Sequence, residues 1–166
     1  MTTIRSSASA QCKIPVYEVR LVRSRRPLRL AEPCLVDPKT SARAFHALIG
    51  CADREHFACL FVNLNNEVTG AHIAAIGAQH AIASIDARAI LRTALAACAS
   101  AMVVSHNHPS GNPRPSDDDR STTEALMRAA LVVGIPILDH VIVTPLPERF
   151  YSMHLHGTLP SVSLQV

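Results

Sequence analysis

The chain has 166 residues, of which 48% are hydrophobic, so it is long enough to form one domain with a proper core. No apolar run approaches the roughly 18 residues that span a bilayer, and the first residues lack the hydrophobic segment of a signal peptide. This composition argues against a membrane span and against secretion. We therefore expect a cytoplasmic protein with no membrane partner.

The net charge of +3 is unevenly distributed along the chain. Residues 1–30 carry a net charge of +6, and the remainder carries −3. The basic side chains of this first segment are Arg5, Lys13, Arg20, Arg23, Arg25, Arg26 and Arg29. Such a cluster can bind a nucleic-acid backbone by displacing counterions, but arginines also protect an exposed edge strand from aggregation. The sequence leaves nucleic-acid contact open as one of these two interpretations.

The five cysteines form an odd set without CxxC spacing, which predicts reduced thiols instead of a disulfide framework. Cys59 lies in an apolar, strand-like run and Cys98 in a helical pattern. Both are therefore expected to be buried as small apolar side chains.

The sequence of the first part of the chain predicts a disordered segment, one strand and one helix. Residues 1–13 are small and polar, and β-branched and aromatic side chains then favour a strand over 14–22. Asp37 is expected to cap a helix over 38–49 with proline at its first position, and Gly50 is expected just beyond its end.

Two strands and a second helix follow. The strands are predicted over about 56–64 and 67–76, joined by a turn at Asn65-Asn66. Asp86 is expected to cap a helix over about 87–99. The face of this helix that we expect to be buried holds Ile90, Leu91, Ala94, Leu95 and Cys98.

The last part of the chain predicts a buried strand over 101–104, a helix over 117–133, a strand over 135–143 and a final strand near 150–155. No internal repeat interrupts this order. Helices that separate runs of strands predict an α/β fold with a central mixed sheet flanked by helices.

Two histidines, His106 and His108, follow directly after the buried strand. Residues at i and i+2 of an extended segment point to the same side, so both imidazoles can reach one ion. The next residues form a stiff loop that contains Pro109, Gly111, Pro113 and Pro115.

A serine and an aspartate begin the helix after this loop. Ser116 is the expected N-cap, and Asp119 then lies in the first turn, near the histidines. Two histidines and one carboxylate leave a fourth tetrahedral position free for water, as in catalytic zinc sites. The same Ser-x-x-Asp spacing is also close to a capping box, which has no catalytic meaning. The conjunction of all these features favours one Zn²⁺ per chain, held by His106, His108 and Asp119.

The spacing His-x-His-Pro, six residues, Ser-x-x-Asp resembles the JAMM motif of MPN/JAB metalloproteases. A narrower resemblance, to the RadC family of bacterial JAB-domain proteins, rests on His106-Asn107-His108-Pro109-Ser110-Gly111, Pro115-Ser116 and Leu138-Asp139-His140. The resemblance implies the cytidine-deaminase-like MPN/JAB fold over 37–157. It leaves 1–36 as an N-terminal extension with a basic strand and 158–166 as a tail.

The resemblance also implies a catalytic glutamate upstream of the motif, and Glu55 matches it because it enters the apolar run 58–64. From its residue type alone, Glu55 would be a solvated residue at a strand start. The resemblance implies that Glu55 acts as general base and that Ser116 hydrogen-bonds the oxyanion or the metal water. His140 is expected to be a hydrogen-bonded core residue, and His154 and His156 surface residues.

Two departures from the family pattern are visible. The stretch 86–89 reads Asp-Ala-Arg-Ala where RadC-like proteins usually carry His-Pro-Arg-Glu, so that Arg88 matches and the glutamate does not. The helix-hairpin-helix region of longer RadC proteins is also missing from the 36 residues upstream, and the chain looks like a short, single-domain form.

The resemblance implies a zinc-dependent hydrolase that cleaves an amide or isopeptide bond in a protein or peptide substrate. The alternative is a non-peptidase module associated with DNA repair or mobile elements, which binds nucleic acid or protein partners. A third reading, phosphodiester hydrolysis, usually requires two metal ions, for which Asp117 and Asp118 are the remaining acids.

Overall fold

The structure is a computed structural model that describes residues 18, 20–24, 27–29, 37–77 and 85–163. The disorder expected for residues 1–13 and much of the strand expected over 14–22 lie outside these ranges. Those residues of 14–22 that are described, Glu18 and residues 20–22, belong to no strand. Of the basic cluster, Arg20, Arg23 and Arg29 are described, and they are exposed.

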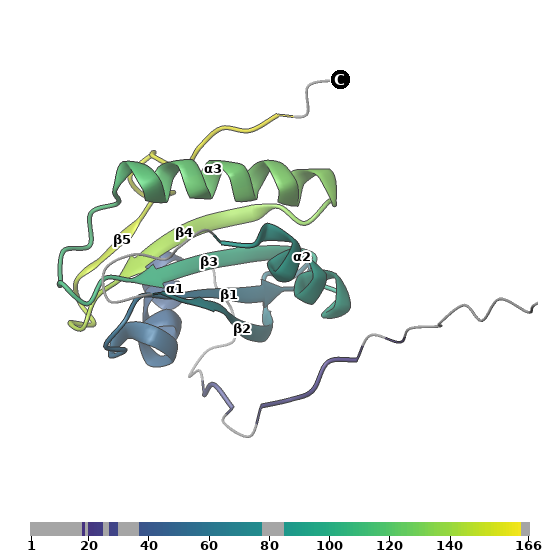
Figure 1. Ribbon diagram of the computed structural model, residues 1–166, viewed down its shortest axis with the longest axis horizontal. Helices are drawn as coiled ribbons and strands as arrows, with labels where there is room; N and C mark the ends of the chain where they lie inside the picture. The colour runs from purple at the N-terminus through teal and green to yellow at the C-terminus, as the bar shows by residue number, and fades with distance from the viewer. Residues whose placement is uncertain (1–17, 19, 25–26, 30–36, 78–84, 164–166) are drawn as a thin grey trace, which may run out of the picture.

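Five strands form one sheet in the order β2-β1-β3-β4-β5 (Figure 1). They are β1 (His56–Val62), β2 (Val68–Ile76), β3 (Ala101–Asn107), β4 (Ile137–Val143) and β5 (Phe150–Ser152). Only β3 and β4 pair in parallel, and the other neighbours are antiparallel. The sheet is therefore mixed, as expected.

Three α-helices cover the sheet: α1 (Pro38–Phe45), α2 (Ala87–Ala96) and α3 (Asp117–Val132). The chain of α1 continues as one π-helical turn, η1 (His46–Gly50). The caps are the expected ones, because the side chains of Asp37, Asp86 and Ser116 accept hydrogen bonds from the first helical turns.

The strand β1 separates two hydrophobic clusters. Phe57, Cys59 and Phe61 pack on one face with side chains of α2 and α3, including Ile90 and Leu126. Ala58 and Leu60 point to the opposite face and pack with α1 and η1. Because both faces are covered, residues 57–62 are all buried and the strand has a continuous apolar sequence. The fold is the predicted α/β sandwich.

The helix α2 ends three residues earlier than predicted, and two side chains expected in the core are exposed. Cys98 adopts a left-handed conformation with φ 52, and the amide of Ala99 donates to the carbonyl of Ala94. This pairing is a Schellman motif, which normally has glycine at the left-handed position, and the cysteine hid it from the sequence pattern. Cys98 is therefore exposed beyond the helix, and Leu95 is 53% exposed.

Gly50 also has a different role from the predicted one. It lies inside the π-helical turn, and a Cβ atom at this position would approach the ring of His46 to 2.4 Å. Glycine is required here by close packing and not by a left-handed helix end.

Strand ends differ from the predictions by one to three residues. The residue Asn63 ends β1 by bonding the amides of Asn65 and Glu67 through its side chain. In the part of the chain that the structure describes, no helix is long and apolar enough to span a bilayer.

The burial of Cys59 gives a first testable prediction. Burial raises the pKa of its thiol to about 12, so that only about one thiol in ten thousand is ionised at pH 8. We expect iodoacetamide to modify the exposed Cys51 and Cys98 in the native protein and Cys59 only after denaturation. Peptide mapping by mass spectrometry measures this, and native labelling of Cys59 at the rate of Cys51 would contradict the packing of β1.

Candidate metal centre

His106 lies near the carboxyl end of the central strand β3, beside the end of the parallel strand β4. His106 is 2% exposed, and the backbone amide of His108 donates to the carbonyl of Val143, 2.8 Å away. The chain thus stays extended through both histidines. Their rings face the same side with Nε2 atoms 2.9 Å apart.

The loop after His108 fixes the orientation of its ring. Nδ1 of His108 lies 2.7 Å from the carbonyl oxygen of Asn112. A carbonyl only accepts, so Nδ1 carries the hydrogen and a neutral His108 has its lone pair on Nε2. Gly111, with φ 79, makes the turn that brings this carbonyl back.

Asp119 reaches the histidines from the first turn of α3. Ser116 and Asp119 form a reciprocal capping box, in which the Ser116 hydroxyl accepts from the Asp119 amide. The amide and the hydroxyl of Ser116 both donate to Oδ2 of Asp119, each at 2.7 Å. Oδ1 is left to face His106 Nε2 at 3.2 Å. Asp119 is therefore both a cap and a member of the cluster.

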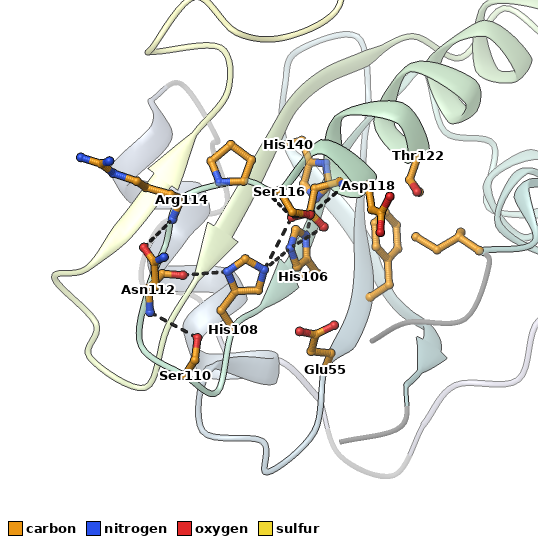
Figure 2. Close-up of a pocket in the computed structure, with 14 residues that line it drawn as sticks. Glu55, His106, His108, Ser110, Asn112, Arg114, Ser116, Asp118, Thr122 and His140 are labelled. Atoms are coloured by element: carbon orange, nitrogen blue, oxygen red, sulfur yellow. Dashed lines mark hydrogen bonds and ion pairs between the residues drawn. The ribbon is translucent and has the colours of Figure 1, made fainter. Parts of the chain in front are cut away.

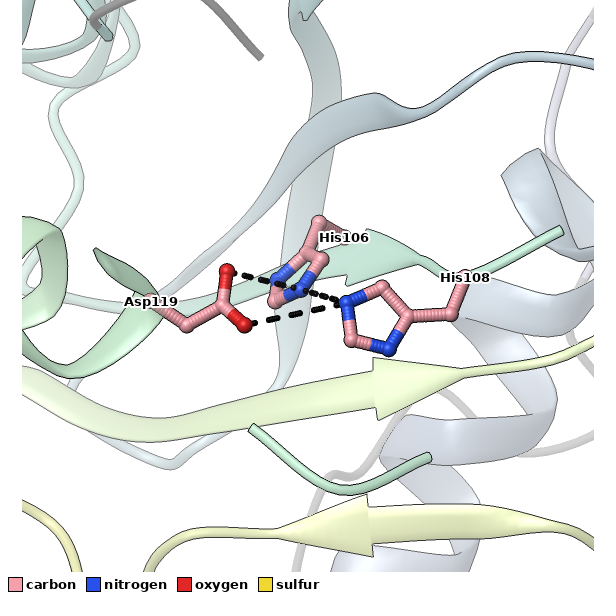
Figure 3. Close-up of side chains that lie close together, drawn as sticks. All are labelled: His106, His108 and Asp119. Carbon is pink, nitrogen blue, oxygen red and sulfur yellow. Dashed lines mark hydrogen bonds and ion pairs between the residues drawn. The ribbon is translucent and has the colours of Figure 1, made fainter. Parts of the chain in front are cut away.

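The three side chains form a compact donor set (Figure 3). The Nε2 atoms of the histidines are 2.9 Å apart, and Asp119 oxygens lie 3.2 Å from His106 and 3.7 Å from His108. Metal bonds of about 2.0 Å at tetrahedral angles separate neighbouring donors by about 3.3 Å. The chemistry and spacing of the donors therefore fit a zinc-sized ion, and the set leaves further positions open.

The electrostatics of the site favour an ionised carboxylate. Burial of Asp119 opposes ionisation, but the neighbouring His106 and the hydrogen bonds from Ser116 outweigh it and hold the pKa of Asp119 well below the usual range. Burial instead lowers the pKa of His140 well below its ordinary value, so this imidazole is neutral at pH 7. The donor set thus places an ionised carboxylate beside two imidazole nitrogens, a combination that suits a divalent cation.

Glu55 lies at the start of β1 and lines the same cavity of about 550 Å³ as the cluster (Figure 2). The β1–β3 register pairs Phe57 with His106. Glu55 lies two residues before Phe57, so this antiparallel register brings it toward the end of β3 that His108 follows. The structure thus brings Glu55 into the same cavity as the donor set, which begins about fifty residues later in the sequence.

Asn107, between the two histidines, holds the backbone on both sides of Glu55. Its side-chain oxygen accepts from the His56 amide at 2.7 Å, and its nitrogen donates to the carbonyl of Arg54 at 3.0 Å. The Glu55 carbonyl in turn accepts from Gly77 at 2.7 Å. Sequence reasoning missed Asn107, although a polar residue inside a fully buried strand is a signal that it has internal partners.

Three other histidines, His140, His154 and His156, lie as the sequence predicts. His140 is 1% exposed, and its Nε2 is 2.8 Å from Nδ1 of His106. Its neighbour Asp139 turns away and bonds Ser152 and the amide of His154. His154 and His156 are exposed, and His156 stacks on Tyr151.

In the segment that departs from the family pattern, Asp86 accepts from the amide of Arg88 and also from its side chain. Both residues are exposed or nearly so, and neither lines the cavity with the cluster. The departing residues therefore form the N-terminal cap of α2 and lie apart from the donor set.

An α/β sandwich with His-x-His at the end of a central strand and an acid in the following helix defines a JAB-type domain. The model of one such family, described as "RadC-like JAB domain", matches residues 35–158. The chain therefore belongs to the RadC-like JAB domain family.

Curated relatives support this assignment. The chain is 36% identical over 140 residues to a "UPF0758 protein" of Rubrobacter xylanophilus, covering 84% of the chain and 59% of the relative. It is 33% identical to a protein of the same name from Desulforudis audaxviator, covering 76% of the chain and 54% of the relative. The chain thus spans little more than half of these relatives, whose names state no activity.

Replacement of Asn107 by alanine is expected to loosen the segment that carries Glu55. The change removes the acceptor of the His56 amide, and we expect a loss of about 2 kcal/mol in the free energy of unfolding and faster hydrogen exchange at this amide. Urea denaturation and amide exchange measure both effects. Asn65→Ala, at an exposed turn position, is the control; equal effects of the two changes would contradict the role of Asn107.

Proposed function

We propose that this protein is a zinc-dependent hydrolase of the JAMM type, which cleaves an amide or isopeptide bond in a protein or peptide. The observation that carries the proposal is the donor set of His106, His108 and Asp119 in one cavity with Glu55. Three ligands leave a coordination position for water, and a carboxylate that is not a ligand is available as a base.

Zinc bound to His106, His108 and Asp119 would lower the pKa of a bound water toward neutrality. Glu55 would accept a proton from the attacking water and deliver it to the leaving amine. The backbone bonds around Glu55 to Asn107 and Gly77 limit where its carboxylate can move. Limited motion supports catalysis, because proton transfer depends on a defined position.

Ser116 is the proposed partner of the developing oxyanion or of the metal water. Its hydroxyl donates to Oδ2 of Asp119 in this structure. The backbone amide of Ser116 donates to the same oxygen, so the carboxylate keeps one bond when the hydroxyl rotates toward a substrate. One hydrogen-bond donor to a developing oxyanion typically contributes a few kcal/mol to transition-state stabilisation.

The alternative is a non-peptidase module that binds nucleic acid or protein. It draws on the basic cluster, whose described members Arg20, Arg23 and Arg29 are exposed. Salt-dependent DNA binding that is lost in a variant with Arg23, Arg25, Arg26 and Arg29 replaced would favour this alternative. A two-metal phosphodiesterase has weaker support, because His106, His108 and Asp119 are the one metal-sized group found among the described residues.

The ligand assignment predicts the metal content of variants. We expect the wild type to hold one zinc per chain, and His106→Ala and Asp119→Ala to hold far less, because two remaining ligands bind zinc weakly. Elemental analysis after removal of free metal measures this. His154→Ala changes an exposed histidine outside the donor set and is the control; one zinc per chain in either ligand variant would exclude the assignment.

Glu55→Gln separates metal binding from turnover. The amide cannot accept the proton of the water, so we expect zinc content to be unchanged and hydrolysis to fall by about 10²-fold to 10⁴-fold. Hydrolysis is measured by mass spectrometry on a panel of peptides and isopeptide-linked peptides. Glu148→Gln, at an exposed position, is the control. Cleavage by Glu55→Gln at the wild-type rate would remove Glu55 as the base.

A further inference from the structure

Two buried polar side chains lie on the Nδ1 side of the His106 ring. Thr123 comes from α3 and His140 from β4, and each is 1% exposed. Nε2 of His140 is 2.8 Å from Nδ1 of His106, and Nδ1 of His140 is 2.5 Å from the hydroxyl of Thr123. Figure 2 shows the His140 ring beyond that of His106.

The direction of these hydrogen bonds follows from the last bond in the series, which Thr123 makes. The Thr123 hydroxyl donates to the backbone carbonyl of Asp119 at 2.5 Å, and a carbonyl can only accept. The hydroxyl has one hydrogen, so toward His140 it acts as acceptor. Nδ1 of His140 must therefore carry a hydrogen, and the lone pair of the neutral ring is on Nε2.

The same reasoning determines the state of His106. Because Nε2 of His140 is an acceptor, Nδ1 of His106 is the donor across the 2.8 Å contact. A neutral His106 then has its lone pair on Nε2, the atom that faces His108 and Asp119. The other tautomer would put a hydrogen on Nε2, directed at the donor set, where it would block a metal.

The other histidine of the donor set is oriented independently, because Nδ1 of His108 donates to the carbonyl of Asn112. Two such imidazoles present lone pairs to each other at 2.9 Å beside a carboxylate. Three acceptors this close repel one another unless a cation or proton lies between them. A hydrogen bond at Nδ1, made to a different part of the fold in each case, thus leaves the Nε2 lone pair of each histidine directed at the donor set.

We propose that Thr123 and His140 are positioning residues that hold His106 in the Nδ1–H tautomer and so set the affinity of the site for zinc. The proposal deepens the proposed function, since it concerns the same site. It adds that α3 would influence a bound ion in two ways. The carboxylate of Asp119 would be a ligand, and the Asp119 carbonyl, through Thr123 and His140, orients the ring of His106. Partners that orient metal-binding histidines typically change affinity by 10-fold to 100-fold.

The first test uses the metal-free protein labelled with ¹⁵N at histidine, at pH 8, where histidines of ordinary pKa are neutral. Long-range ¹H–¹⁵N correlation spectra distinguish the two tautomers of His106. We expect the wild type and Thr123→Ser, which keeps the hydroxyl, to have the hydrogen on Nδ1. Thr123→Val has nearly the same shape without the hydroxyl, and we expect a mixture of tautomers. A pure Nδ1–H tautomer in Thr123→Val would overturn the proposal.

The second measurement is zinc affinity by competition with a chelator. We expect zinc to bind 10-fold to 100-fold more weakly to Thr123→Val and with nearly wild-type affinity to Thr123→Ser. Wild-type affinity in Thr123→Val would contradict the proposal. If the wild type itself bound no zinc, the proposed function would fail, whereas the tautomer of His106 would still test this inference on its own.

A second pair of variants covers the case in which Thr123→Val does not fold. His140→Gln keeps a side-chain oxygen that can accept from Nδ1 of His106, and His140→Leu has no acceptor. We expect the glutamine variant to retain the Nδ1–H tautomer and most of the affinity, and the leucine variant to lose both. Equal behaviour of the two variants would show that His140 does not act through this bond.

Discussion

The parallel pairing of β3 with β4 is the constraint on which the site depends. Parallel neighbours need a crossover, and here α3 supplies it. The crossover must leave β3 at its carboxyl end, so the first turn of α3 lies beside the last residues of that strand. His106 and Asp119 therefore meet although a loop of several residues separates their elements. Ligands in open α/β sheets commonly bind at this end of the strands.

The antiparallel pairing of β1 with β3 brings Glu55 to the candidate site, beside the three residues of the donor set. The register that sets Phe57 opposite His106 also brings Glu55 to the cavity. A shift of one residue would turn every side chain of β1 to the other face and exchange the two hydrophobic clusters. The core that fixes this register therefore also places Glu55, the proposed base, in the cavity that contains His106 and His108.

Local sequence patterns predicted what depends on neighbouring residues. The caps at Asp37, Asp86 and Ser116, the α/β class and the association of His106, His108 and Asp119 all follow from short spacings. Glu55 did not follow from spacing, because its place depends on strand order, and only the resemblance to a family indicated it. Thr123 and Asn107 were missed for the same reason, since their partners lie on other elements. Cys98 was placed wrongly because cysteine rarely occupies a left-handed helix end.

The capping box at the start of α3 has a consequence for the way in which this domain folds. Small zinc domains such as zinc fingers unfold when the ion leaves, because nothing else holds their ligands. Here hydrogen bonds within the protein hold each member of the donor set: Ser116 donates to Oδ2 of Asp119, His108 donates to a loop carbonyl, and His106 bonds a buried imidazole. The folding of this domain therefore depends on hydrogen bonds within the protein, so that removal of a bound cation by a chelator is expected to leave the chain folded.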